Sequence, residues 1–156
     1  MLVSPLRLWF ALFVLYLALD ARPARADVSL GGHFAVNLDH GNVHLGADAL
    51  IPIKQITPRV QLALWPNFAH VFIHDGRDVE LLGFDVPFAF NALSDVVIPF
   101  VAPGLGLSIG DETTVKVNAI GGVFFHVGRV RPFTAIAVRF VRNTYTDLLA
   151  GLLIDL

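Results

Sequence analysis

Residues 28–53 read VSLGGHFAVNLDHGNVHLGADALIPI, and apolar and polar side chains alternate along most of this stretch. Val28 and Leu30 fall on one parity, whereas Ser29 and His33 fall on the other. Successive side chains of a β-strand point to opposite faces, so this two-residue rhythm predicts strands with one apolar face and one mixed face.

The same rhythm returns in segment after segment up to Leu156 and predicts eight antiparallel strands, each long enough to cross a bilayer at the usual tilt. Gly41-Asn42 predicts a two-residue type II′ turn and Asp75-Gly76 a type I′ turn, because glycine accepts a positive φ. Pro66 cannot donate to a ladder, so we expect a bulge or bend there. Gly31-Gly32 and Gly121-Gly122 are interpreted as strand kinks that permit tight curvature. The expected strands cover about 28–40, 43–53, 79–90, 97–109 and 148–156, with a third that starts near Arg59, a sixth that contains Val115–Val127 and a seventh that contains Thr134–Phe140.

The first 26 residues have the layout of a secretory signal peptide. Arg7 precedes an apolar run from Leu8 to Leu19, and Ala24-Arg25-Ala26 fits a small-x-small cleavage site. The run is shorter than the roughly 20 residues that a transmembrane helix needs. An uncleaved anchor is the alternative, although polar residues stand before the cleavage site. We therefore expect a signal peptide at 1–26, cleavage after Ala26 and a single β-barrel domain at 27–156.

Composition narrows the class of protein further. The chain of 156 residues has no cysteine and a formal net charge of −2. The lack of cysteine excludes disulfides, zinc–thiolate sites and thiol nucleophiles. Its basic residues form no cluster, so nucleic acid is not an expected partner. A small exported domain without disulfides needs another source of stability, and closure of a sheet into a barrel provides one.

The mixed strand faces indicate which side of the barrel points inward. They carry charges of both signs in mid-strand together with bulky apolar residues such as Leu50, Ile120 and Phe124, whereas a water-exposed wall would be richer in Lys and Glu. The apolar faces are rich in Val, Leu, Ile and Phe, as lipid contact requires. We predict an all-β, eight-stranded antiparallel up-and-down transmembrane β-barrel with its apolar face outward. The charges expected in the lumen are Asp48, Asp85, Lys116, Arg131 and Arg139.

Two segments resemble the small eight-stranded outer-membrane barrels of the OmpA-like family. Gly151-x-x-Ile154-x-Leu156 resembles their C-terminal assembly signal, with Leu in place of the usual final Phe or Trp. Residues 98–106, IPFVAPGLG, resemble their Pro-aromatic-x-x-x-Gly-x-Gly strand. The resemblance implies a location in the outer membrane of a Gram-negative bacterium. It also implies outer-membrane lipid and the barrel-assembly machinery as partners, and a monomer. The expected mature chain has one Trp, Trp65, and one Tyr, Tyr145, so its interfacial aromatic girdles would be thin, which counts against a membrane barrel.

Histidine–aspartate pairs are the first candidates for chemistry. A two-residue turn after His40 would pair Asp39 with His44 in the lumen, and His33 and Asp48 would share that face. Such pairs could serve acid–base or metal chemistry. Lumen packing, in which an Asp accepts a hydrogen bond from a His, is the simpler interpretation.

Serines are the second candidates, because some outer-membrane barrel enzymes modify lipid A with a Ser and a His. Ser94 falls in an expected loop, and Ser29 and Ser108 have no histidine at an obvious neighbouring position. We therefore expect no enzyme, no catalytic, cofactor-binding or metal-binding residues, and no cofactor.

The expected function is that of an outer-membrane barrel with a structural, anchoring or surface-interaction role and no open pore. Eight strands leave interior room only for side chains or one small ligand. One alternative is a soluble, exported, lipocalin-like barrel whose apolar interior binds an apolar ligand. A second alternative is a lipid A-modifying barrel enzyme. Any small ligand stays unidentified at this point.

Overall fold

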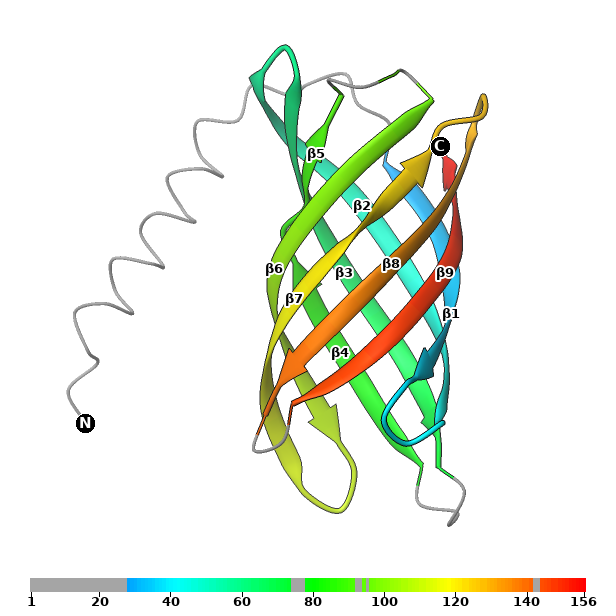
Figure 1. Ribbon diagram of the computed structural model, residues 1–156, viewed down its shortest axis with the longest axis vertical. Helices are drawn as coiled ribbons and strands as arrows, with labels where there is room; N and C mark the ends of the chain where they lie inside the picture. Colours follow the sequence, from blue (N-terminus) through cyan, green and yellow to red (C-terminus); the bar gives the residue numbers. More distant parts are fainter. Residues whose placement is uncertain (1–27, 74–77, 92–93, 95, 142–143) are drawn as a thin grey trace, which may run out of the picture.

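The computed structural model describes residues 28–73, 78–91, 94, 96–141 and 144–156, and the predicted signal peptide lies outside them. Figure 1 shows the strands tilted around a common axis. No helix in these ranges is long and apolar enough to cross a membrane. The strands are β1 (Ser29–Asn37), β2 (Val43–Thr57), β3 (Val60–Phe72), β4 (Val79–Asp85), β5 (Phe88–Phe90), β6 (Val97–Ile109), β7 (Thr113–Phe125), β8 (Val130–Phe140) and β9 (Tyr145–Asp155).

The sheet closes on itself as an eight-stranded antiparallel barrel, as the alternation predicts. The first strand, β1, pairs with the last, β9, from Ser29 opposite Asp155 to Asn37 opposite Asp147. Because the first and last strands pair, the sheet keeps no open edge along this seam. Closure of this kind supplies the stability that a small domain without disulfides needs.

Two of the nine segments, β4 and β5, act as one strand of the wall between β3 and β6. Val86-Pro87 interrupts that strand, because proline has no N–H for the ladder. Backbone bonds carry the pairing across the gap: Ala63 N donates to the Pro87 oxygen at 3.0 Å and Val86 N to the Pro103 oxygen at 2.9 Å. The strand expected at 79–90 is therefore present, with a break inside it.

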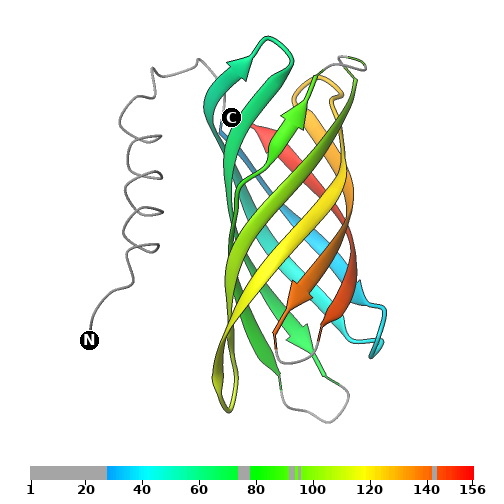
Figure 2. The ribbon, with the colours of Figure 1, turned by 60° about the vertical axis from the view of Figure 1, so that its left-hand side comes forward.

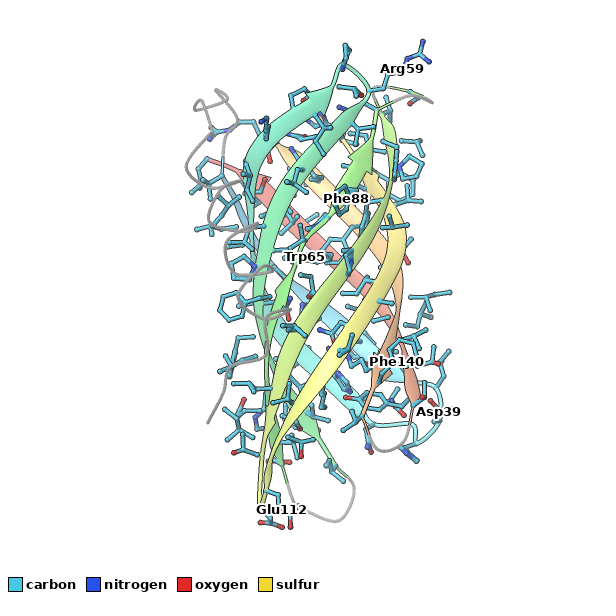
Figure 3. The ribbon with its side chains drawn as sticks, turned by 90° about the vertical axis from the view of Figure 1, so that its left-hand side faces the viewer. Asp39, Arg59, Trp65, Phe88, Glu112 and Phe140 are labelled. Carbon is cyan, nitrogen blue, oxygen red and sulfur yellow. The ribbon has the colours of Figure 1, made fainter. Side chains whose placement is uncertain are left out.

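The two ends of the barrel differ in the loops that they carry (Figures 1 and 2). We call the end with the β2–β3 turn and Leu156 the C-terminal mouth. The end with the loops at 38–42 and 110–112 is the opposite mouth. In Figure 3, Arg59 marks the C-terminal mouth, Glu112 marks the opposite mouth and Trp65 lies between the two ends.

The first hairpin differs from the two-residue turn predicted at Gly41-Asn42. Its loop spans 38–42, and Asn37 N donates to the Asn42 oxygen at 2.8 Å. The Asn37 side chain starts the turn early, because its Oδ1 accepts from Asp39 N at 3.2 Å and His40 N at 2.8 Å. Gly41 closes the loop with a φ of 69°. The predicted turn is therefore wrong, and the register that followed from it is wrong too.

Two further strand details differ from expectation. The register between β2 and β3 is the same on both sides of Pro66, so the predicted irregularity is not there. The irregularities lie instead in β2, between Pro52 and Lys54 and between Gln55 and Thr57. Tyr145, which was expected in the loop before the last strand, is the first residue of β9. Asp75-Gly76 lies outside the described residues.

The apolar parity faces outward, as predicted. On β7, Val115 is 65% exposed and Val117 is 50% exposed, whereas Lys116 between them is 7% exposed. The lumen charges expected at Asp48, Asp85 and Arg139 are buried as well. A lipocalin-like barrel has the reverse arrangement, so that alternative is wrong about the direction of the faces.

Glycines at the β1–β9 seam permit a close approach of the two backbones. A Cβ added at Gly31 would lie 1.8 Å from the Leu152 carbonyl oxygen, which no side chain can occupy without a backbone shift. On β9, Gly151 leaves room in the lumen for the Phe133 ring, which a Cβ at this position would approach to 2.4 Å. These glycines therefore permit close contact between strands and side chains, and the strand kinks expected at Gly31-Gly32 and Gly121-Gly122 stay a prediction.

Candidate functional site

The lumen is the candidate functional site, because it gathers the buried polar side chains of the chain. On β4, β6, β7 and β8, residues that are paired across the strands form rows. Neighbouring rows point to opposite sides of the barrel wall. The paired row Asp85, Gly104, Asn118 and Arg139 faces inward, and the adjacent paired row Phe84, Leu105, Val117 and Phe140 faces outward.

Asp48 is the acceptor of the first buried cluster. Its Oδ2 lies 2.8 Å from His33 Nδ1, and its Oδ1 accepts from Trp65 Nε1 at 2.9 Å. Gly46 makes room for the His33 ring, which a Cβ would approach to 2.3 Å. All three polar side chains are buried, so their hydrogen bonds are made in a medium of low dielectric, where an unmade bond is costly.

Asp85 is the acceptor of a second cluster, in which both donors are neutral amides. Its Oδ2 accepts from Asn67 Nδ2 at 2.7 Å and its Oδ1 from Asn118 Nδ2 at 3.1 Å. Gly83 and Gly104 lie against these side chains, and a Cβ at either position would collide with them. The carboxyl group of Asp85 is fully buried, so its position is fixed by the two amides.

Asp147 accepts hydrogen bonds from two strands near the opposite mouth and lies close to a third. Arg139 Nε donates to its Oδ2 at 2.6 Å, and Asn37 Nδ2 donates to its Oδ1 at 2.8 Å. His44 Nε2 lies 3.9 Å from the same Oδ1. A buried ion pair of this kind is stable only while both partners are present, since either charge alone is uncompensated.

Asp155 occupies the corresponding place at the C-terminal mouth. Ser29 Oγ donates to its Oδ1 at 2.5 Å, and Arg131 Nη2 lies 3.2 Å from both carboxylate oxygens. His126 Nε2 is 3.7 Å from Oδ2. The Arg129 guanidinium donates to the Asp155 carbonyl oxygen, so the end of β9 is held from β1 and β8 together.

Four aromatic rings fill the lumen between these clusters, and we call them the aromatic plug: Trp65, Phe100, Phe124 and Phe133. Trp65 packs edge-on against Phe100 with ring centroids 5.6 Å apart and against Phe133 at 5.2 Å. Phe100 and Phe124 stack at 4.2 Å. None of the four rings is more than 3% exposed. The middle of the lumen is therefore packed with side chains.

A cavity lies at each end of the lumen. The one at the C-terminal mouth has a volume of about 170 Å³ and is lined by residues that include Gln61, Asn91 and Arg131. The one at the opposite mouth has a volume of about 230 Å³ and is lined by residues that include His44, Lys116 and Tyr145. Phe124 of the plug borders the first cavity.

The structure brings together one of the two predicted His–Asp pairs. His33 and Asp48 are in contact, and the arrangement is the expected packing in which a buried Asp is satisfied. Asp39 and His44 are apart, because His44 pairs with Ala35 in the actual register. The Asp39 carboxylate is exposed and accepts from Thr146 N at 2.7 Å.

The serines make contacts that do not resemble a catalytic dyad. Ser29 is fully buried and bonded to Asp155. Ser94 Oγ accepts from Val96 N and Val97 N at 2.9 Å, which is a local turn contact. In the described part of the chain, no serine is hydrogen-bonded to a histidine, and no three His, Cys, Asp or Glu side chains are grouped to hold a metal ion.

Sequence reasoning missed three features of the lumen. It considered Trp65 and Tyr145 only as members of thin interfacial girdles, yet Trp65 is buried in the plug. Tyr145 accepts a hydrogen bond from Lys116 Nζ inside the opposite mouth. Asp147 was not singled out, although its parity, opposite to that of the exposed Leu148, places it inward. A parity count along 145–155 is the signal that could have found it.

Comparisons with known proteins agree on the fold. No protein-family model and no curated protein sequence matches this chain. Among solved structures, the N-terminal β-barrel domain of Pseudomonas aeruginosa OprF matches with a TM-score of 0.66 and 13% identity, covering 84% of this chain and 98% of that one. Ail of Yersinia pestis matches at 0.59 and 9%, with 84% and 97% covered. Neisserial surface protein A matches at 0.55 and 12%, with 84% and 96% covered. The chain has the fold of small eight-stranded outer-membrane barrels.

Proposed function

We propose that the chain is an exported, monomeric outer-membrane barrel that anchors itself in lipid and presents short loops, without an open pore and without catalysis. The observation that carries this proposal is the pair of rows on β4, β6, β7 and β8. The outward row exposes Phe84, Leu105 and Val117 to the surroundings, at 59%, 51% and 50%. An apolar band outside and a polar interior is the arrangement of a membrane barrel.

The size of the outward apolar surface supports lipid as its occupant. Large apolar residues on every long strand are more than a third exposed, from Leu30 on β1 to Ile154 on β9. A monomer in water rarely exposes a contiguous apolar patch larger than a few hundred Å². A band that runs around a closed barrel suits a bilayer, which would cover all sides at once.

The last strand supports assembly as an outer-membrane barrel. Three apolar residues at the end of the chain lie on the outward face. Leu152 and Ile154 of β9 are 44% and 47% exposed, and Leu156, which follows β9, is 62% exposed. These residues include the positions that resemble the C-terminal assembly signal. An outward apolar row on a terminal strand is accessible to a barrel-assembly machinery before the seam with β1 closes.

Fractionation of cells that express the full chain tests this function. We expect the protein in the outer-membrane fraction, resistant to alkaline extraction, with a folded form that migrates differently on gels before and after heating. Recovery as an alkaline-extractable soluble protein would contradict the proposal. The mass spectrum of lipid A from the same cells is expected to match that of cells without the chain. A changed spectrum would favour the enzyme alternative.

A charge on the outward row tests lipid contact directly. Leu105→Arg is expected to lower the free energy of unfolding by about 2–4 kcal/mol, because Arg on the lipid face is unfavourable near the middle of the bilayer. Ile56→Arg is the matched control, since Ile56 is 48% exposed but lies beside the turn at the C-terminal mouth. Unfolding in urea, in lipid vesicles, gives both values.

The two variants separate the alternatives. In lipid, Leu105→Arg is expected to be clearly less stable than Ile56→Arg. If both variants unfold at the same urea concentration as the unsubstituted chain, the outward row does not contact lipid and the proposal fails.

A further inference from the structure

The cavity at the opposite mouth has two chemically distinct walls. Val71, Ile73, Val79 and Leu81 from β3, β4 and the segment between them form an apolar wall. Polar side chains from β1, β2, β7 and β9 line the rest of the cavity, among them His44, Lys116 and Tyr145, and His44 is paired with Val71 in the β2–β3 ladder. A volume of about 230 Å³ exceeds the 150 Å³ or so of an engineered cavity that binds benzene, so a small organic molecule fits.

Lys116 supplies a positive charge that the neighbouring residues leave without a carboxylate. It is 7% exposed, and its Nζ donates to Tyr145 Oη and lies 4.9 Å from the centroid of that ring. Among the described residues, no ion pair within 4 Å includes Lys116. A buried ammonium group without a counter-charge favours an anion in the space beside it.

The nearest carboxylate is already used. Asp147 accepts from Arg139 at 2.6 Å and from Asn37 at 2.8 Å, so its charge is balanced by the guanidinium.

His44 provides an independent sign of a missing partner. The side chain is 2% exposed and lines the cavity, yet its buried Nδ1 has no hydrogen-bond partner. The other ring nitrogen, Nε2, points toward Asp147 at 3.9 Å. Nδ1 is one of six buried side-chain nitrogen and oxygen atoms without a hydrogen-bond partner among the described residues, and folded proteins satisfy most such atoms.

We propose that this cavity binds a short-chain carboxylate, with the carboxylate on Lys116 and beside His44 and the hydrocarbon chain along the wall of Val71, Val79 and Leu81. The apolar wall gains by removal of its surface from water, and the anion supplies the counter-charge that Lys116 lacks. The aromatic plug lies deeper in the lumen, so the ligand enters and leaves by the opposite mouth. This site holds a ligand and adds a function to that of an anchor.

Tyrosine NMR of the full chain folded in dodecyl maltoside tests the site. Tyr145 and Tyr16 are the tyrosines of the chain, so labelled tyrosine gives a signal from the cavity that disappears in Tyr145→Phe. Hexanoate is expected to shift the Tyr145 signal saturably. Hexylammonium, which has the same chain length and the opposite charge, is expected to bind at least roughly tenfold more weakly.

Variants at the two mouths provide the controls. Lys116→Met keeps an unbranched side chain one atom shorter, removes the charge and is expected to abolish the hexanoate shift. Gln61→Ala alters the other cavity and is expected to leave the shift unchanged. Trp65 fluorescence reports in each case whether the barrel is folded.

Three results would overturn the inference: no saturable shift with hexanoate, equal shifts with hexanoate and hexylammonium, or an undiminished shift in folded Lys116→Met. The comparison of the two probes needs no variant, so it decides the matter even if Lys116→Met does not fold. The binding measurement is made in detergent and does not depend on where the protein lies in the cell. A negative result therefore contradicts the ligand site alone, whereas fractionation tests the outer-membrane location.

Discussion

Gly31→Ala is expected to prevent closure of the barrel, although it adds a single methyl group. The new Cβ would lie 1.8 Å from the Leu152 oxygen and 2.8 Å from the Leu153 Cα, both backbone atoms of β9. Backbone atoms in a paired strand cannot move aside as a flexible side chain can. We expect a loss of about 4 kcal/mol in the free energy of unfolding, at the upper end for point substitutions.

The measurement is the fraction of the variant that shows the folded, heat-sensitive band on gels, followed across urea concentrations. Gly121→Ala is the matched control, because Gly121 also lies in a strand and a Cβ there meets nothing within 4 Å. Gly121→Ala is expected to fold as the unsubstituted chain does. Equal folded fractions for the two variants would mean that the β1–β9 seam tolerates a side chain at Gly31.

Trp65→Ala is expected to produce the second large effect, by emptying the centre of the aromatic plug. Large-to-small substitutions of buried aromatic residues destabilise by about 3–5 kcal/mol, because a cavity remains. Trp65 contacts Phe100, Phe124 and Phe133, so three rings lose a neighbour. Asp48 Oδ1 loses its hydrogen bond from Trp65 Nε1 as well. Urea unfolding followed by circular dichroism measures the loss.

Trp65→Phe divides this loss into its two causes. It retains a six-membered ring in the plug and removes the N–H donor with the rest of the indole, so we expect a smaller loss of about 1–3 kcal/mol, chiefly from the unsatisfied carboxylate. If Trp65→Phe is as unstable as Trp65→Ala, the whole effect belongs to the hydrogen bond. If Trp65→Ala is as stable as the unsubstituted chain, the plug does not stabilise the barrel.

The fold could be predicted from the sequence because it depends on parity, which is a local property. Val115, Lys116 and Val117 alternate in the chain and alternate in exposure on β7. Side-chain parity survives small errors in strand ends. The last strand begins at Tyr145 rather than near Leu148, yet exposed Leu152 and Ile154 still alternate with buried Leu153.

The lumen contacts could not be predicted in the same way, because they depend on register between strands. The Asn37 side chain accepts hydrogen bonds from two backbone amides, so the first turn begins earlier than predicted. In the resulting register, Asp39 and His44 are not paired. The buried place of Trp65 could not be predicted either, because its contacts with Asp48 and Phe133 join different strands of the barrel. The contact between Arg139 and Asp147 could be predicted only if the register between β8 and β9 were known.

The interruption at Val86-Pro87 has a mechanical consequence for the wall. The seam between β1 and β9 joins two chain ends with no loop between them, yet it pairs continuously from Ser29 to Asn37. Between β5 and β6, by contrast, only Phe88 and Ala89 have ladder partners. The six pairs of β4 and the bond from Val86 N to the Pro103 oxygen complete the line, so the interrupted strand keeps eight pairs with β6, as many as join β1 to β2. The interruption therefore loosens the wall only locally, near the C-terminal mouth, and leaves the ring as closed there as elsewhere.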